Sequence, residues 1–206
     1  NQWDPLDEDD ENEGTVTVDD VVEQEPPVAE DDVFGVRRGA VTTLPLLYND
    51  HDPNKKDVLT IAPDALSGLS EGGFGDVRLA SDNQVAVVNV AAGEGSATFT
   101  YAVSDGNAQS APATVTLTVV PDDINNPPVW CGVENCTQEP LTPQVSPGGY
   151  VSIPVLNGWV DPEGDVFALT AAYANDPNAP VTVVATVDGN VVIRHLDPNA
   201  GDAIIL

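Results

Sequence analysis

The chain has 206 residues, 41% of them hydrophobic, which is enough apolar material for one large domain or two small ones. It carries 34 acidic and 6 basic residues, a formal net charge of -28. Because proteins bind nucleic acids and anionic membrane surfaces largely through Lys and Arg, this balance excludes both as partners and favours cations. The apolar residues are mostly Val, Ala, Leu and Ile interspersed with Thr, and no stretch has helical apolar spacing or the length of a membrane span. We therefore predict an all-β protein that does not insert into a membrane.

Residues 1–25 carry acidic side chains at close intervals and no basic one. Such a block repels itself, so we expect an extended acidic leader. Within it, residues 15–22 (TVTVDDVV) have the β-branched character of a strand and are typical of the end of a preceding repeat.

Residues 26–121 contain short β-prone segments with turn residues between them. In residues 98–103 and 114–119 every second residue is large and apolar, the pattern of a sheet with one buried and one solvated face. The other such segments are 41–47, 58–61, 76–79 and 84–90. Short strands at regular spacing indicate a β-sandwich of roughly 100 residues, the size of an immunoglobulin-like domain.

The pattern restarts after a joint at residues 122–128. Residues 127–129 repeat 26–28 at an offset of 101, whereas residues 152–156 repeat 43–47 at an offset of 109. The extra length matches the loop between Cys131 and Cys136, so the second repeat is the first with a loop inserted.

The second sandwich is predicted over residues 129–206. It includes two β-prone segments, 181–187 and 190–194, joined by a hairpin turn at Asp188-Gly189. It has no counterpart of the first repeat's last strand and is predicted to be incomplete. Two explanations are open: the chain is a slice of a longer array, or another copy donates the strand head to tail, with residues 15–22 as the candidate donor.

The two cysteines lie five residues apart, and no further cysteine or nearby histidine completes a zinc site. We therefore predict a local disulfide between Cys131 and Cys136, which implies an oxidising compartment outside the cytoplasm. Asn135 begins an Asn-Cys-Thr triplet and is a candidate for N-glycosylation.

These motifs, in this order, resemble the cadherin-like and immunoglobulin-like repeats that occur in tandem in long bacterial surface proteins. The resemblance covers residues 26–206 and rests on PVAEDD at 27–32, LYNDHDP at 47–53 with Asp57, YAVSDG at 101–106 and DINNPP at 123–128. It implies tandem β-sandwiches in an extracellular or cell-surface adhesin, stalk or scaffold, with calcium at the joints. Lys55 and Lys56 depart from the acidic or Gly residues that are usual there, which weakens the first site.

Strand direction in a seven-stranded sandwich brings the loop after the second strand and the loop before the last strand back to the N-terminal pole. That gathers six carboxylates of the first repeat. A group of this kind needs a cation to stay ionised, and its oxygen ligands suit Ca²⁺ better than zinc or copper. The six are Asp31, Asp32, Asp50, Asp52, Asp57 and Asp105.

A second calcium site is predicted at the joint, where the loop at residues 161–165 meets the linker. Its candidate ligands are Asp161, Glu163, Asp165, Asp122, Asp123 and Asn125. The competing interpretation for both sites is that Asp, Asn, Gly and Pro simply form turns.

Catalysis is not indicated. His51 lies among acids in a loop, and His195 follows a strand and is expected at the surface. A glycosidase-like carboxylate pair would need a sugar-stacking cleft, for which 3 Trp, 4 Tyr and 4 Phe leave little. We expect a structural spacer whose partners are neighbouring repeats, with a carbohydrate- or protein-binding module as the alternative. An exposed aromatic patch around Trp130 and Trp159 would favour that alternative.

Overall fold

The computed structural model describes residues 23–54, 57–200 and, for the backbone, 204–205. Within these ranges the elements are strands apart from one short 3-10 helix, η1 (Leu46–Tyr48), which confirms the all-β class. None of the described segments is a helix long and apolar enough to cross a bilayer. Most of the predicted leader, with the strand-like residues 15–22, lies outside the described residues, as do Lys55 and Lys56.

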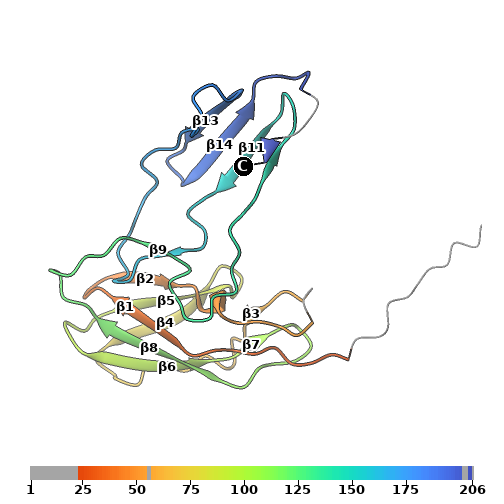
Figure 1. Ribbon diagram of the computed structural model, residues 1–206. Coiled ribbons are helices and arrows are strands. Elements are labelled where there is room, and N and C mark those ends of the chain that lie inside the picture. The colour runs from red at the N-terminus through yellow and green to blue at the C-terminus, as the bar shows by residue number, and fades with distance from the viewer. Residues whose placement is uncertain (1–22, 55–56, 201–203, 206) are drawn as a thin grey trace, which may run out of the picture.

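The first repeat is a two-layer sandwich, drawn at the bottom of Figure 1. One layer has the strand order β2-β5-β4 and is antiparallel; its strands are β2 (Val41–Leu44), β4 (Gly75–Ala80) and β5 (Val85–Val90). The other layer has the order β1-β8-β6, with β1 parallel to β8; its strands are β1 (Asp32–Val36), β6 (Ser96–Tyr101) and β8 (Ala113–Val119). A short pair, β3 (Thr60–Ile61) with β7 (Val103–Ser104), extends the sandwich toward its N-terminal pole.

The core of the first repeat lies between these layers and follows the predicted alternation. Phe99 and Tyr101 of β6 are buried, as are Val115 and Leu117 of β8, while the residues between them are less buried. Each such side chain contributes about 1.5–3 kcal/mol when fully buried. The β4–β5 hairpin turns through residues 81–83, whose positive φ angles of 53°, 55° and 64° are tolerated best by Asp and Asn. Sequence analysis gave no bounds for the strand that precedes residues 41–47, because Asp32 and Gly35 interrupt the apolar pattern of β1.

The second repeat has a smaller core. Its main sheet has the order β11-β14-β13, the short pair of β10 with β15 lies beside it, and β9 with β12 forms a separate ribbon. The core is formed by Val145, Ile153, Val191 and Ile193, with partly buried neighbours. The strands are β9 (Val129–Trp130), β10 (Gln144–Val145), β11 (Tyr150–Pro154), β12 (Trp159–Val160), β13 (Val181–Ala185), β14 (Asn190–His195) and β15 (Ile204–Ile205).

Two features of the β13–β14 hairpin bear on the sequence predictions. Gly189 has φ 81° at the predicted turn, and a Cβ there would lie 2.6 Å from Leu156 Cδ1, so only glycine fits. His195 at the end of β14 is 2% exposed, and its Nδ1 accepts the N–H of Asp197 at 3.1 Å. The expected surface position of His195 was therefore wrong, because β14 is central in its sheet and turns this side chain inward.

The ribbon formed by β9 and β12 belongs by sequence to the second repeat but packs on the first. Val160 and Val133 join the partly buried rim of the first repeat's core. At Gly35 of β1, an added Cβ would lie 2.1 Å from the carbonyl oxygen of Pro162, so the two repeats touch backbone to backbone. Figure 1 shows this ribbon lying between the two bodies of the molecule.

Candidate metal centre and the joint between the repeats

Three carboxylates meet at the N-terminal pole of the first repeat. Asp57 precedes β3 and Asp105 follows β7, and these strands pair through Thr60 and Ser104. The pairing brings the two loops together, and Asp52, in the loop after η1, completes the group. One carboxylate oxygen from each of Asp52, Asp57 and Asp105 lies within 4.8 Å of the others. We call these three residues the pole cluster.

The pole cluster contains buried oxygens that nothing satisfies. The Oδ2 atoms of Asp52, Asp57 and Asp105 have no hydrogen-bond partner among the described residues. In contrast, Oδ1 of Asp105 accepts the N–H groups of Ala108 and Asn107, each at 2.6 Å, which lower the pKa of this carboxyl. Unpaired buried carboxylate oxygens are costly, so the geometry fits a cation. The all-oxygen donor set on loops fits Ca²⁺, which would complete its six to eight ligands with carbonyl oxygens and water.

Two of the six predicted pole residues surround a tyrosine instead. The Tyr101 hydroxyl lies 3.1 Å from Asp32 Oδ2 and 3.1 Å from both carboxylate oxygens of Asp50, and Asp50 Oδ1 also accepts the Glu30 N–H at 2.9 Å. Burial raises the pKa of Asp32 to about 7 and that of Asp50 to about 7, and it also raises the pKa of Tyr101. The Tyr101 hydroxyl has one proton to donate, and two carboxylates compete for it. We therefore expect one of the two carboxyls to hold a proton of its own, which reduces the negative charge of the group.

Asp31, the sixth residue, is exposed and accepts the backbone N–H of Thr114 at 2.7 Å. The structure thus brings three of the predicted ligands together, while the other three form hydrogen bonds elsewhere in the first repeat. Tyr101 was missed as part of this arrangement, although its place two residues after Phe99 on the buried face indicated an inward hydroxyl needing a partner.

The predicted ligands in the second repeat also come together, and we call Asp161, Glu163 and Asp165 the joint cluster. One oxygen from each lies within 4.8 Å of the others. Asp161 Oδ1 accepts the N–H groups of Glu163 and Asp165, both at 3.0 Å. The Glu163 carboxylate accepts Asn126 N–H at 2.9 Å and Asn126 Nδ2 at 2.6 Å, which lowers the pKa of Glu163.

A guanidinium binds Asp165, one of the carboxylates that sequence analysis assigned to a metal ion. Arg37, at the end of β1, donates from Nε to Asp165 Oδ1 at 2.9 Å and from Nη2 to Asp165 Oδ2 at 2.6 Å. The same group donates to the carbonyl oxygens of Pro121, at the end of the first repeat, and of Ile124, in the linker, each at 2.7 Å. Its side chain is only 13% exposed, and it lowers the pKa of Asp165. Arg37 therefore ties the first repeat, the linker and the second repeat together.

The remaining predicted joint ligands are solvent-facing. Asp122 pairs with the exposed Arg38 at 2.7 Å, and Asp123 is exposed without belonging to the joint cluster. Asn125 lines a shallow surface hollow with Arg37 and Asp122. Sequence analysis missed Arg37, yet two adjacent arginines among only 6 basic residues were a signal that could have found it.

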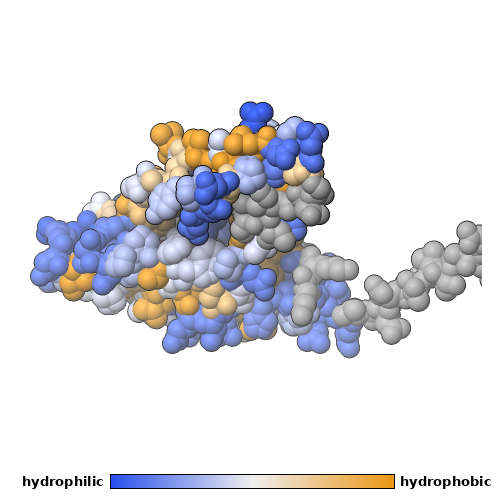
Figure 2. All heavy atoms as spheres, turned by 45° about the horizontal axis from the view of Figure 1, so that its top comes forward, coloured by the Kyte–Doolittle hydropathy of each residue, from blue (hydrophilic) through white to orange (hydrophobic). Residues whose placement is uncertain are grey.

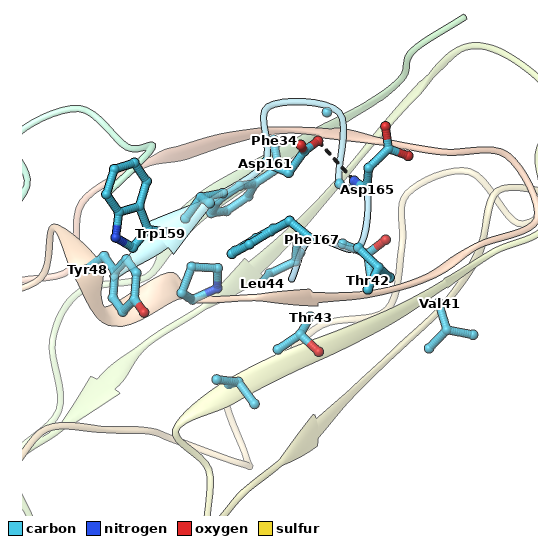
Figure 3. A pocket seen from close by; sticks show the side chains of 16 residues that line it. Phe34, Val41, Thr42, Thr43, Leu44, Tyr48, Trp159, Asp161, Asp165 and Phe167 are labelled. Carbon is cyan, nitrogen blue, oxygen red and sulfur yellow. Dashed lines mark hydrogen bonds between the residues drawn. The ribbon is translucent and has the colours of Figure 1, made fainter. Parts of the chain in front are cut away.

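An interdomain hollow of about 340 Å³ lies beside the joint cluster. Figure 3 shows Phe34 and Thr42 of the first repeat facing Trp159 and Phe167 of the second, with Asp161 and Asp165 at one end. Because its lining comes from both repeats, the hollow is part of their contact.

The Cys131–Cys136 disulfide is formed, as predicted, with a Cα–Cα distance of 6.1 Å. Cys131 is buried, and its N–H donates to Gly158 O at 2.6 Å. Thr137, the next residue after the loop, reaches the first repeat: its N–H donates to Tyr48 O at 2.7 Å. Asn135 is exposed in this loop, and its glycosylation stays a prediction.

Trp130 and Trp159 form an edge-to-face pair with ring centroids 6.0 Å apart. Trp159 is 42% exposed. The pair ends a groove of about 400 Å³ whose other walls include Pro140, Leu141 and Pro143. Figure 2 shows apolar side chains gathered in places on an otherwise hydrophilic face. The aromatic patch that would favour a binding module is therefore present in part.

The fold defines a class: the first repeat is an immunoglobulin-like β-sandwich, and a second β unit follows it. Residues 24–118 match the family model of a bacterial Ig domain. This confirms the predicted resemblance for the first repeat. The model stops short of the joint, so it says nothing of the second repeat.

Two further comparisons add little. No curated protein matches the chain. Among solved structures, the N-terminal Ig1-2 module of the Drosophila receptor protein tyrosine phosphatase DLAR is similar to 83% of this chain over 84% of its own, at 16% identity and a TM-score of 0.30. A similarity this low carries no argument about function.

Proposed function

We propose that this chain is a structural spacer from an extracellular array of immunoglobulin-like repeats, stiffened by a guanidinium at the joint and by calcium at the pole. The observation that carries the proposal is the set of contacts made by Arg37. This side chain, directly after β1, bonds to Asp165 of the second repeat, to the Pro121 carbonyl at the end of the first repeat and to the Ile124 carbonyl in the linker. Three segments held by one largely buried group cannot swing freely, and a fixed orientation is what a spacer needs.

The orientation of the repeats is the property to measure. Two spectroscopic labels, one in each repeat, should report a narrow distance distribution in the native chain. Arg37→Gln should broaden it, whereas the matched variant Arg38→Gln should leave it narrow, because the ion pair of Arg38 is with the exposed Asp122 and does not reach the second repeat. A broad distribution in the native chain would contradict the spacer.

The calcium part of the proposal is assigned to the pole cluster. There the buried Oδ2 atoms have no donor among the described residues, whereas at the joint the N–H groups of Asn126 and Arg37 already meet Glu163 and Asp165. A metal ion at the joint would have to displace these donors. Calorimetric titration with calcium chloride should detect one binding site. The double variant Asp57→Asn, Asp105→Asn should remove it.

Lysine is the competing cation at the pole. Lys55 and Lys56 lie outside the described residues but between Asp52 and Asp57 in sequence. If calcium is the ligand, the double change of Lys55→Gln and Lys56→Gln should leave binding intact or strengthen it. If this variant loses stability without calcium and the native chain binds none, a lysine occupies the pole.

The spacer role implies three further proposals: the chain has no catalytic role, it is located at the cell surface, and its partners are neighbouring repeats or head-to-tail copies. The donor candidate at residues 15–22 is tested by deleting residues 1–25. If these residues donate the strand, the truncated protein should be monomeric and less stable, and an added peptide spanning residues 13–23 should restore its stability.

A second candidate, a binding module, is favoured by the groove beside Trp130 and Trp159. Exposed tryptophan faces stack on neutral sugars and pack on apolar peptides. Binding of an oligosaccharide or peptide that Trp159→Ala abolishes would support it. Screens of both ligand classes that detect no tryptophan-dependent binding would leave the spacer alone.

A further inference from the structure

We propose that Thr137, held by the disulfide loop of the second repeat, is a positioning residue for the calcium site of the first repeat. The inference rests on the proposed calcium site at the pole cluster. It adds that calcium affinity depends on a segment which sequence assigns to another domain.

The first step is the contact itself. Thr137 donates its N–H to Tyr48 O at 2.7 Å, and its Oγ1 lies 3.0 Å from the same oxygen and 3.1 Å from Asp50 O. The N–H and the hydroxyl together can serve both carbonyls at once. Further, the Tyr48 hydroxyl accepts the N–H of Gly158 at 3.0 Å. The second repeat therefore grips the backbone of residues 48–50 from outside.

The backbone that Thr137 contacts leads to the proposed calcium site. Asp50 is fixed from inside by the Glu30 N–H and the Tyr101 hydroxyl. Held on both sides, residues 48–50 lead directly into Asp52, which supplies one carboxylate of the pole cluster. A calcium site is tight only when its ligands are already in place, because ordering a loose loop on binding lowers the affinity.

The third step is why the disulfide matters. Thr137 directly follows Cys136, and Cys131 is anchored by its own hydrogen bond to Gly158 O. The covalent link therefore connects Thr137 to the β9–β12 ribbon, which packs on the first repeat. On its other side Thr137 leads into exposed residues 138–142, which have no assigned strand or helix. The disulfide therefore limits how far Thr137 can move from Tyr48.

The test compares calcium affinity in variants of the full chain. Thr137→Val removes the hydroxyl and keeps the disulfide, whereas Cys131→Ser with Cys136→Ser removes the link. Each should weaken calcium binding roughly fivefold or more, the usual scale of coupling between sites. Thr182→Val on β13, an exposed threonine of the second repeat, is the control and should bind like the native chain.

Reduction is an independent arm. A dithiol donates two electrons and two protons, the S–S bond breaks to two thiols, and the dithiol closes to its own disulfide. Calcium affinity should fall as it does in the serine variant. In calcium-free protein, amide exchange at residues 49–52 should also become faster after reduction, a change seen without any metal.

The outcomes separate the two proposals. If the native chain binds no calcium, the proposed calcium site fails, and the positioning role for calcium fails with it. If the native chain binds calcium and all variants bind it equally, the positioning role alone is overturned. Weaker binding in Thr137→Val with an unchanged melting temperature of the first repeat would support it, since a general loss of folding is then absent.

Discussion

The pole cluster and the joint cluster are both groups of three acids on loops, within 4.8 Å of one another, but their surroundings are opposite. At the joint, N–H donors from Asn126 and Arg37 meet two of the three carboxylates. At the pole, each aspartate keeps one buried oxygen without a donor among the described residues. Acidic spacing alone therefore does not identify a metal site. The hydrogen-bond donors that face the carboxylates decide whether a cation is still needed to balance their charge.

The largest expected effect comes from calcium at the pole. With calcium at 100 times its dissociation constant, the folded first repeat should gain about 2.7 kcal/mol of unfolding free energy. Asp57→Asn combined with Asp105→Asn should remove this gain, and Asp123→Asn, in the exposed linker, should not. Thermal unfolding with and without a chelator measures it. If the double variant keeps this gain, calcium does not bind at the pole cluster.

The buried acids around Tyr101 should make stability depend on pH in the absence of calcium. The pKa of Asp32 and of Asp50 is raised from 3.8 to about 7 by burial, with Asp31 and Glu30 adding repulsion. The folded state thus binds more protons than the unfolded state between about pH 4 and 7. Unfolding free energy should fall as pH rises through this window, by at most about 1.4 kcal/mol per pH unit for each group, and level off above it. Rising stability from pH 5 to 7 in denaturant titrations would contradict this.

Tyr101→Phe should lower the unfolding free energy in a pH-dependent way. It removes the hydroxyl that both carboxylates approach, and we expect a loss of about 1–3 kcal/mol at pH 8. The loss should shrink at pH 5, where the carboxyls are protonated and can donate to each other. Phe99→Leu, on the same face of β6, is the control, because a packing change should cost the same at both pH values.

The smallest change in stability is expected at the joint, where orientation changes instead. Arg37→Gln should loosen the two repeats while each keeps its own fold, since neither Arg37 nor Asp165 belongs to a hydrophobic core. A chelator should leave the joint unchanged in small-angle scattering. Loosening by the chelator alone would show that calcium, not the guanidinium, holds the joint.

Much of the first repeat was predictable because its strands obey a period of two. The alternation in residues 98–103 and 114–119 correctly indicated buried Phe99 and Leu117. Strand direction also predicted that the loops carrying Asp52, Asp57 and Asp105 would meet, because neighbouring antiparallel strands bring those loops to one end. This argument works wherever regular local structure determines position.

Other contacts could not be predicted, because they join residues far apart in sequence. Arg37 meets Asp165 across 128 positions, and nothing local in either segment indicates the pairing. Asp32 looked like a loop ligand, yet β1 pairs with β8 and turns it toward Tyr101. The inward turn of His195 similarly depends on β14 lying between β11 and β13.

The most direct test of the central claim is a calcium titration followed by amide chemical shifts, because it locates binding by residue. The contrast between the clusters predicts saturable shifts around residues 52, 57 and 105–108, with residues 126 and 161–165 little changed. Saturable shifts centred on residues 161–165, or none at the pole, would contradict it.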